Sequence, residues 1–121
     1  MKELTKAEEQ IMQVIWQEKK AFIKDIIDHL PEPKPAYNTV GTFLKILENK
    51  GFVARKKYGN TYEYSPIIEK RQYTNFFMKG FVAKYFDGSM ERMLSYFIKQ
   101  NDIDLKTFEE YNEKLKNNEN D

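Results

Sequence analysis

The sequence predicts a mainly helical fold that contains one small β-hairpin. Apolar residues recur at helical spacing in several segments, and prolines or glycines separate these segments. Two short runs of strand-forming residues flank a turn at residues 58–60, which places the hairpin in the middle of the chain. The expected order of elements is helix, short strand, helix, helix and hairpin, followed by three more helices.

The first helix is expected to begin after Thr5 and to end between residues 17 and 19. Thr5 and Glu8 have the spacing of a capping box, in which each side chain accepts a hydrogen bond from the backbone N–H of the other residue. The apolar stripe that follows includes Ile15, and Trp16 is expected to widen it as a core residue.

A short strand over residues 21–23 and a second helix over residues 24–30 are expected next. Three prolines between residues 31 and 35 end that helix, because proline lacks the N–H that a continuing helix needs. The third helix is expected to start at Pro35, which is tolerated in a first turn, and to stop at Gly51, a typical C-terminal cap.

The third helix has two contrasting sides. Its apolar residues recur at i, i+3, i+4 and i+7 and predict a buried stripe formed by Val40, Phe43, Leu44 and Leu47. The opposite side carries small polar groups and one cation: Asn38, Thr42, Lys45 and Asn49. This exposed face therefore offers hydrogen-bond donors and no carboxylate.

Strands expected over residues 52–57 and 61–65 form the hairpin, which has basic residues near its tip. A helix with a donor-rich face, followed at once by a basic hairpin, is typical of a winged helix-turn-helix protein. In such proteins a recognition helix and a wing bind a DNA groove and its phosphates. The alternative is an ordinary amphipathic helix with a solvated face, because helix-turn-helix patterns are degenerate.

Six residues are the candidate DNA contacts: Asn38, Thr39, Thr42, Lys45, Arg55 and Lys57. The asparagine is suited to pair with adenine, the threonines to meet a thymine methyl group or a phosphate, and Lys45 to reach guanine or the backbone. Arg55 and Lys57 lie two residues apart on a strand, so they are expected to share a face and to bind phosphates.

Gly41 stands inside the third helix, where glycine costs about 1 kcal/mol relative to alanine. Two explanations are open. The helix could approach a DNA groove closely at this point, or the glycine could relieve crowding against a neighbouring helix.

The distribution of charge favours nucleic acid more than its total does. The whole chain has a formal net charge of only +1. Between residues 33 and 65, however, six lysines and arginines stand against two glutamates, so that segment alone carries +4. Positive charge is thus gathered where the helix and hairpin are expected, which is the pattern of a DNA-binding surface.

Several functional classes lack support in the sequence. The chain has no cysteine and a single histidine, so thiolate metal sites are excluded and no metal or cofactor is expected. His29 is expected to be a helix-end residue, and no nucleophile motif or glycine-rich phosphate loop is present, so the protein is not expected to be an enzyme. No apolar run is long enough for a signal peptide or a membrane span, so a cytoplasmic protein is expected.

The segment after Pro66 differs in composition, because most of the aromatic residues lie there. Three helices are expected, over residues 70–86, over residues 90–98 and after Asp104. Such short helices make a poor core by themselves, so we expect them to pair with a second copy of the chain. The candidate dimerisation residues are Phe76, Phe77, Phe81, Met93, Leu94, Phe97 and Phe108. The alternative is that these helices fold back onto the winged helix of the same chain.

The domain organisation that follows is a winged helix-turn-helix DNA-binding domain over residues 1–66 and a helical dimerisation domain over residues 67–121.

Four motifs occur in order along nearly the whole chain: Leu4-Thr5-x-Ala7-Glu8-x-x-Ile11-Met12-x-x-Ile15-Trp16, Tyr37-Asn38-Thr39-Val40-x-Thr42-x-Leu44-x-x-Leu47-x-x-Lys50-Gly51-Phe52-Val53, Gly59-x-x-Tyr62-x-Tyr64-x-Pro66 and Phe86-Asp87-Gly88-Ser89. Together they resemble the penicillinase-repressor family, known as BlaI/MecI/CopY. The resemblance implies a homodimeric bacterial repressor that binds a palindromic operator in double-stranded DNA through its winged helix and dimerises through its C-terminal helices.

The resemblance also implies that a membrane sensor-protease system relieves repression by cleavage in the helix after Gly88-Ser89. The equivalent bond here is Tyr96-Phe97, where penicillinase and methicillin repressors have Asn-Phe. The C-terminal cysteine motif of the copper-responsive members is absent. Ala36 stands where many relatives have a capping serine, and Gly41 replaces a larger residue, so the operator sequence does not transfer. The alternative function is a winged helix that binds another protein and not a specific DNA sequence.

Overall fold

The computed structural model describes residues 1–101 and 104–119, except for the side chains of Leu105, Phe108, Asn118 and Glu119. The chain divides into two compact units, Met1–Phe77 and Met78–Asp121. The predicted domain boundary after Pro66 stays a prediction, and the division between the two units falls after Phe77.

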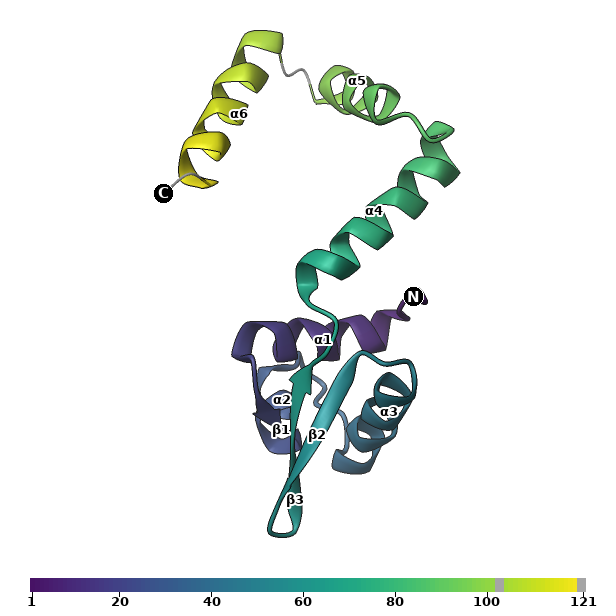
Figure 1. Ribbon diagram of the computed structural model, residues 1–121, viewed down its shortest axis with the longest axis vertical. Coiled ribbons are helices and arrows are strands. Elements are labelled where there is room, and N and C mark those ends of the chain that lie inside the picture. Colours follow the sequence, from purple (N-terminus) through teal and green to yellow (C-terminus); the bar gives the residue numbers. More distant parts are fainter. Residues whose placement is uncertain (102–103, 120–121) are drawn as a thin grey trace. The chain divides into compact units, whose positions relative to one another are not determined.

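The first unit is a helical layer packed on a small sheet (Figure 1). It contains α1 (Lys6–Glu18), β1 (Ala21–Phe22), α2 (Ile23–His29), α3 (Tyr37–Asn49), β2 (Val53–Tyr58), β3 (Thr61–Pro66) and the start of α4 (Lys70–Phe86). The second unit contains the rest of α4, α5 (Met90–Gln100) and α6 (Leu105–Glu119). This is the order of elements that the sequence predicts.

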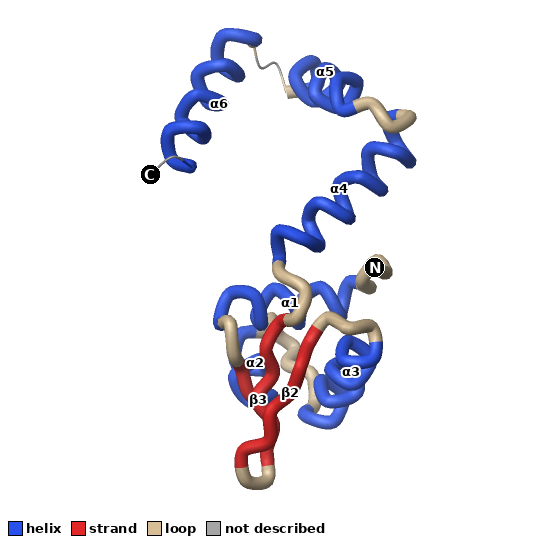
Figure 2. The backbone as a smooth tube through the Cα atoms, viewed as in Figure 1, coloured by secondary structure: helices blue, strands red, loops and turns tan. Residues whose placement is uncertain are grey.

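The sheet of the first unit has three antiparallel strands in the order β1-β3-β2. The short strand β1 pairs with β3 through Ala21 and Tyr64, so the hairpin is anchored to the helical layer at one end. Its other end, the turn between β2 and β3, extends beyond the helices (Figure 2). The hairpin therefore has a buried base and an exposed tip.

The predicted capping box of α1 is confirmed. Thr5 Oγ1 accepts a hydrogen bond from Glu8 N at 3.3 Å, and Glu8 Oε1 accepts one from Thr5 N at 2.8 Å. Glu8 is also almost fully buried, with 2% of its surface exposed. Its carboxylate accepts two hydrogen bonds of 2.9 Å from Lys50 Nζ, so an ion pair links the start of α1 to the end of α3.

The end of α3 shows why Gly51 is needed there. Gly51 has a positive φ of 82°, and its N–H donates to the carbonyl of Glu48. The N–H of Phe52 donates to the carbonyl of Leu47, which completes a Schellman motif. Phe52 therefore belongs to the cap of α3, and β2 starts at Val53, one residue later than expected.

The start of α3 also differs from the expectation. Ala36 has extended φ and ψ angles of −69° and 152° and takes the N-cap position, so the helix starts at Tyr37 and not at Pro35. Its side chain cannot cap, and no side-chain hydrogen bond caps the helix. The predicted apolar stripes are otherwise present, with Ile15, Leu44 and Leu47 completely buried, and Ile26 and Phe52 join them in the core.

The first turns of α4 are part of the winged-helix core. The Tyr73 hydroxyl accepts a buried hydrogen bond of 2.9 Å from Leu4 N. The Tyr73 ring lies 5.9 Å from the Trp16 ring and 5.7 Å from the Phe52 ring, measured between centroids. Trp16 itself donates from Nε1 to the carbonyl of Ile68 at 2.9 Å, so it is the core residue that the sequence predicts.

In the second unit, Ser89 caps α5 by accepting a hydrogen bond from Arg92 N at 3.1 Å. Asp104 precedes α6, as expected, and accepts a hydrogen bond from Thr107 N at 2.7 Å. None of the residues of α5 is buried. No helix within the described residues has the length and apolar character that a membrane crossing needs.

Candidate nucleic-acid interface

The two sides of α3 differ as predicted. Val40, Leu44 and Leu47 have no exposed surface, and Phe43 is half-buried against them. The predicted contact residues on the other side, Asn38, Thr39, Thr42 and Lys45, are all exposed. Packing against α1, α2 and the sheet thus fixes the helix and leaves its polar face open.

One hydrogen bond within α3 limits what its polar face can offer. Thr42 Oγ1 donates to the carbonyl of Asn38 at 3.0 Å. The hydroxyl proton of Thr42 is therefore used inside the helix, and the methyl group remains for an apolar contact such as a thymine methyl group. Thr42 is thus better suited to contact the thymine methyl group than to donate to a phosphate.

The N-terminus of α3 has no side-chain cap. Ala36 provides no side-chain cap, and the first turn contains no acidic residue. The first backbone N–H groups of a helix lack partners within the helix and carry partial positive charge. Phosphate contacts from such groups are common in protein–DNA complexes, so this end of α3 complements the cations of the hairpin.

Arg55 and Lys57 share one face of the hairpin, as predicted. Their register partners on β3 are Tyr64 and Tyr62. Val53 is on the same face of β2 and is buried, so this face continues from the core that α3 covers to the exposed tip. The two candidate phosphate ligands therefore lie on the face of the sheet that packs against the candidate recognition helix.

Lys56 lies on the opposite face of the hairpin. Its Nζ is 5.3 Å from the centre of the Tyr58 ring, and that ring makes an edge contact with Phe22 at 6.0 Å between centroids. Lys56 and Lys57 are therefore adjacent in sequence and carry the same charge, but their side chains lie on opposite faces of the hairpin.

Arg55 is held by residues from two other elements. Its Nε lies 3.1 Å from Glu48 Oε2 on α3, and its guanidinium carbon is 4.3 Å above the centre of the Tyr62 ring on β3. The sequence alone does not predict this pair. No rule of local spacing connects a helix residue to a strand residue across the Gly51 turn, so only the folded structure reveals the contact.

Tyr64, which lies opposite Arg55 in the sheet, is only 5% exposed. Burial raises the pKa of the Tyr64 hydroxyl, and the charge and hydrogen bonding of Arg55 act in the opposite direction without cancelling the effect. The phenol therefore stays neutral near pH 7, so it puts no negative charge beside a DNA phosphate.

Not every cation of the basic segment is available. Lys50 is committed to the buried carboxylate of Glu8, on the side of α3 that faces α1. Lys45 and Lys57, by contrast, make no ion pair with the residues that the structure describes. Fewer cations are thus available to DNA than the count of lysines and arginines in residues 33–65 suggests. The available charge is concentrated on Lys45 and on the hairpin.

Gly41 is not required by packing. A Cβ atom built at this position would lie 3.9 Å from the Ile23 side chain, which is ordinary van der Waals contact. Crowding against the neighbouring helix therefore does not explain the glycine. Of the two explanations for Gly41 that the sequence left open, the close approach of α3 to DNA remains as a prediction.

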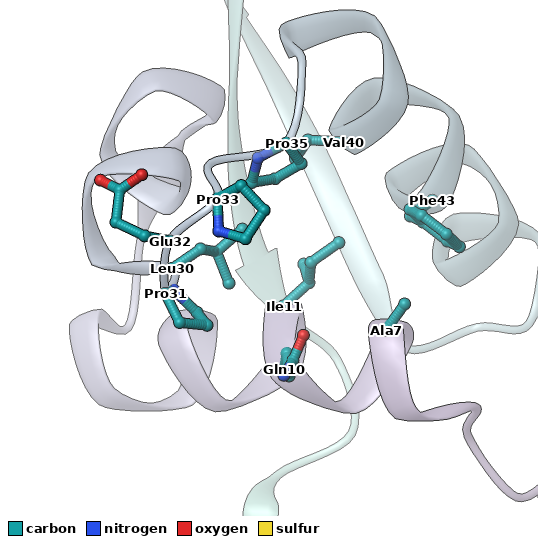
Figure 3. Close-up of a pocket in the computed structure, with 10 residues that line it drawn as sticks. All are labelled: Ala7, Gln10, Ile11, Leu30, Pro31, Glu32, Pro33, Pro35, Val40 and Phe43. Carbon is teal, nitrogen blue, oxygen red and sulfur yellow. The ribbon is translucent and has the colours of Figure 1, made fainter.

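A cavity of about 260 Å³ lies on the inner side of α3 (Figure 3). Its lining comes from α1, the proline-containing loop and α3: Ala7, Gln10, Ile11, Leu30, Pro31, Glu32, Pro33, Pro35, Val40 and Phe43. The Glu32 carboxylate points away from the apolar side chains in this view. The cavity is on the side opposite Asn38 and Thr42, so it is separate from the candidate interface.

The candidate dimerisation residues fall into both units. Phe76 packs against the winged-helix core, and Phe77, 37% exposed, makes a ring contact with Tyr73 at 6.3 Å between centroids. Phe81, Met93 and Phe97 line an apolar cavity of about 300 Å³ in the second unit, together with Met78, Phe86 and Tyr96. The side chain of Phe108 lies outside the described residues.

Comparison with known proteins identifies the family. The profile of the penicillinase repressor family matches residues 4–117. The methicillin resistance regulatory protein MecI of Staphylococcus aureus strain N315 is 28% identical over 109 residues, which cover 89% of each chain. The penicillinase repressor of Staphylococcus aureus is also 28% identical over 109 residues, covering 89% of this chain and 86% of that one.

A solved structure supports the same assignment. The solution structure of the DNA-binding domain of the repressor BlaI matches with a TM-score of 0.51 and 28% sequence identity, covering 60% of this chain and 94% of that domain. This likeness confirms the predicted winged helix-turn-helix fold. Because the family profile matches nearly the whole chain, from the capping box of α1 into α6, the protein belongs to the penicillinase repressor family.

Proposed function

We propose that the protein is a transcriptional repressor that binds double-stranded operator DNA through α3 and the β2–β3 hairpin. The observation that carries the proposal is that an exposed polar helix face and two cations of the hairpin belong to elements that pack directly on each other, with Arg55 paired to Glu48 of α3. The exposed polar face of α3 carries Asn38, Thr39, Thr42 and Lys45. Arg55 and Lys57 extend from the sheet face that packs against α3. The first set reads bases in the major groove, and the second binds phosphates.

The repressor acts as a homodimer on a palindromic operator. Support comes from the second unit, which exposes large apolar side chains: Tyr85, Met90, Leu94, Tyr96 and Phe97 are between 37% and 62% exposed. An apolar surface of this kind is unusual for a monomer and is typical of an interface. Two copies on one duplex also gain affinity, because binding of the first half raises the effective concentration of the second.

Cleavage of the bond between Tyr96 and Phe97 relieves repression, and the protease belongs to a membrane sensor system. Both residues are more than half exposed and lie on α5. Both also line the apolar cavity of the second unit. A cut there separates α6 and the end of α5 from the rest, so it removes part of the dimer surface. The repressor itself acts in the cytoplasm, where its operator is.

Selection of bound duplexes from a random DNA pool, at two salt concentrations, tests the proposal. A dimer with two recognition helices should enrich an inverted repeat with half-sites about one helical turn apart. The logarithm of the affinity should fall with the logarithm of the salt concentration, with a slope of about −0.9 for each phosphate contacted.

A different experimental result would contradict each part of the proposal. No enrichment above background at low salt would favour the alternative, a winged helix that binds another protein. Enrichment of a single half-site, with a monomer in sedimentation, would contradict the dimer. Equal dimer fractions for the intact chain and for a chain cut after Tyr96 would contradict the mechanism of relief.

A further inference from the structure

We infer that Glu48 is a positioning residue for DNA binding: it holds the Arg55 guanidinium against the Tyr62 ring, in the orientation in which Arg55 binds a phosphate. This inference rests on the proposed function, because it assigns the acidic residue of α3 a role in the same interface. It is unexpected from charge alone, since a carboxylate beside DNA repels the phosphates.

The contacts within the protein involve one part of the Arg55 guanidinium, and the other part remains accessible to DNA. Glu48 Oε2 lies 3.1 Å from Nε, the nitrogen nearest the chain. The guanidinium carbon lies 4.3 Å from the centre of the Tyr62 ring, so a cation–π contact holds the group from a second side. Arginine has five N–H donors in a planar fork. The contact of Nε with Glu48 and the interaction of Arg55 with the Tyr64 hydroxyl use part of this set, and the remaining N–H donors of the terminal nitrogens are left to bind a phosphate.

The position of the group matches this use. Arg55 is 45% exposed and Glu48 33% exposed, so the pair lies at the surface and not in the core. Arg55 shares its face of the hairpin with Lys57, and Glu48 lies on α3. The pair therefore joins the candidate recognition helix to the candidate wing at the edge where both would meet DNA.

A fixed arginine binds more tightly than a mobile one. A free arginine side chain loses rotational freedom when it binds a phosphate, and that entropy is subtracted from the affinity. In this protein Glu48 and Tyr62 already restrict Arg55 before DNA binds. An exposed ion pair contributes at most about 1 kcal/mol, so the expected effect of Glu48 on affinity is about three- to fivefold.

The experiment is a double-mutant cycle on a selected operator duplex, with affinity measured at several salt concentrations. Glu48→Ala should weaken binding by about three- to fivefold, although it removes a negative charge. Glu48→Gln should retain most of the affinity, because its amide oxygen can take the place of the carboxylate oxygen beside Nε. In an Arg55→Gln background, Glu48→Ala should not weaken binding.

Glu63→Ala is the matched control. Glu63 lies on β3 opposite Lys56, on the other face of the hairpin, so its removal changes the net charge equally without releasing Arg55. This variant should leave the affinity unchanged or raise it slightly. Thermal unfolding of each variant checks the fold. Glu48→Met, which keeps the length of the side chain, replaces Glu48→Ala if the alanine variant unfolds.

The inference is overturned if Glu48→Ala tightens binding by the same factor with and without Arg55, because Glu48 then acts by simple repulsion. It is also overturned if Glu48→Gln weakens binding as much as Glu48→Ala does. Failure of the proposed function looks different. In that case the unmodified protein shows no salt-sensitive binding to any duplex, and the cycle has nothing to measure.

Discussion

Lys50 Nζ lies 2.9 Å from both carboxylate oxygens of Glu8, and this ion pair connects the C-terminal end of α3 to the N-terminal turn of α1. Glu8 has 2% of its side chain exposed and Lys50 has 21%. The Glu8 carboxylate also accepts a hydrogen bond from the backbone N–H of Thr5. This one buried group therefore completes the capping box of α1 and, through Lys50, connects α1 to the candidate recognition helix.

Replacing Lys50 with methionine should lower the free energy of unfolding by about 2 kcal/mol, because it leaves the buried carboxylate of Glu8 without a cation. Lys45→Met on the exposed side of the same helix is the matched control and should change stability by less than about 0.5 kcal/mol. Adding Glu8→Gln to Lys50→Met should recover part of the loss, since glutamine can keep the capping box. Urea unfolding measures all three, and equal stability of both lysine variants would contradict the prediction.

The ion pair between Glu8 and Lys50 also makes the free energy of unfolding depend on pH. Burial alone would raise the pKa of Glu8, but hydrogen bonds from Thr5 and the charge of Lys50 outweigh burial, so the pKa of Glu8 is below its usual value. A carboxyl group with a lower pKa in the folded state contributes stability above its unfolded pKa, and this contribution is lost as the pH falls through the folded pKa.

The free energy of unfolding should therefore decrease as the pH falls below about 4, the usual range of a glutamate. Urea titrations between pH 3 and 7 measure this decrease, and Glu8→Gln should reduce the slope. If the slope of the variant equals that of the unmodified protein, other carboxylates are responsible.

Gly41→Ala should raise the free energy of unfolding by about 1 kcal/mol, since alanine is the better helix former and its Cβ meets only ordinary contact with Ile23. The same change should weaken operator binding if α3 approaches the groove closely at this point. Gly80→Ala on α4 is the control, because a Cβ there meets nothing within 4 Å, and it should leave operator binding unchanged. Higher stability with unchanged affinity would show that Gly41 does not serve DNA approach.

Lys57→Ala should lower operator affinity and reduce the salt slope by about 1, as expected for one lost phosphate contact. Lys56→Ala removes the same charge from the opposite face of the hairpin and should have a smaller effect on both quantities. Binding titrations at several salt concentrations compare the two variants. Equal effects would mean that the face of the hairpin does not matter and that only its net charge does.

Local sequence rules were sufficient for much of the fold. The capping box of Thr5 and Glu8 and the stop at Gly51 depend on residues within one helical turn, so a short stretch of sequence contains the whole signal. The apolar stripe of α3 is equally local, because the helical repeat alone determines which residues share a side. The sequence therefore placed the exposed face of α3 correctly.

The pairing of charged residues could not be predicted in this way. Glu8 meets Lys50 and Glu48 meets Arg55 only after separate elements have packed, and no local spacing describes either contact. Counting charges along residues 33–65 consequently treated Lys50 as available for DNA. A folded structure is needed to tell which cations are already paired.

The contact between Tyr73 and Leu4 matters for any attempt to isolate the winged helix. Tyr73 provides the acceptor for Leu4 N, and Ile68 provides the acceptor for the Trp16 indole, although both follow the hairpin in sequence. A fragment that ended at Pro66 would leave one buried and one partly buried donor without partners and would uncover one side of Phe52. A truncated DNA-binding half that folds as it does in the whole chain must therefore extend to Phe77.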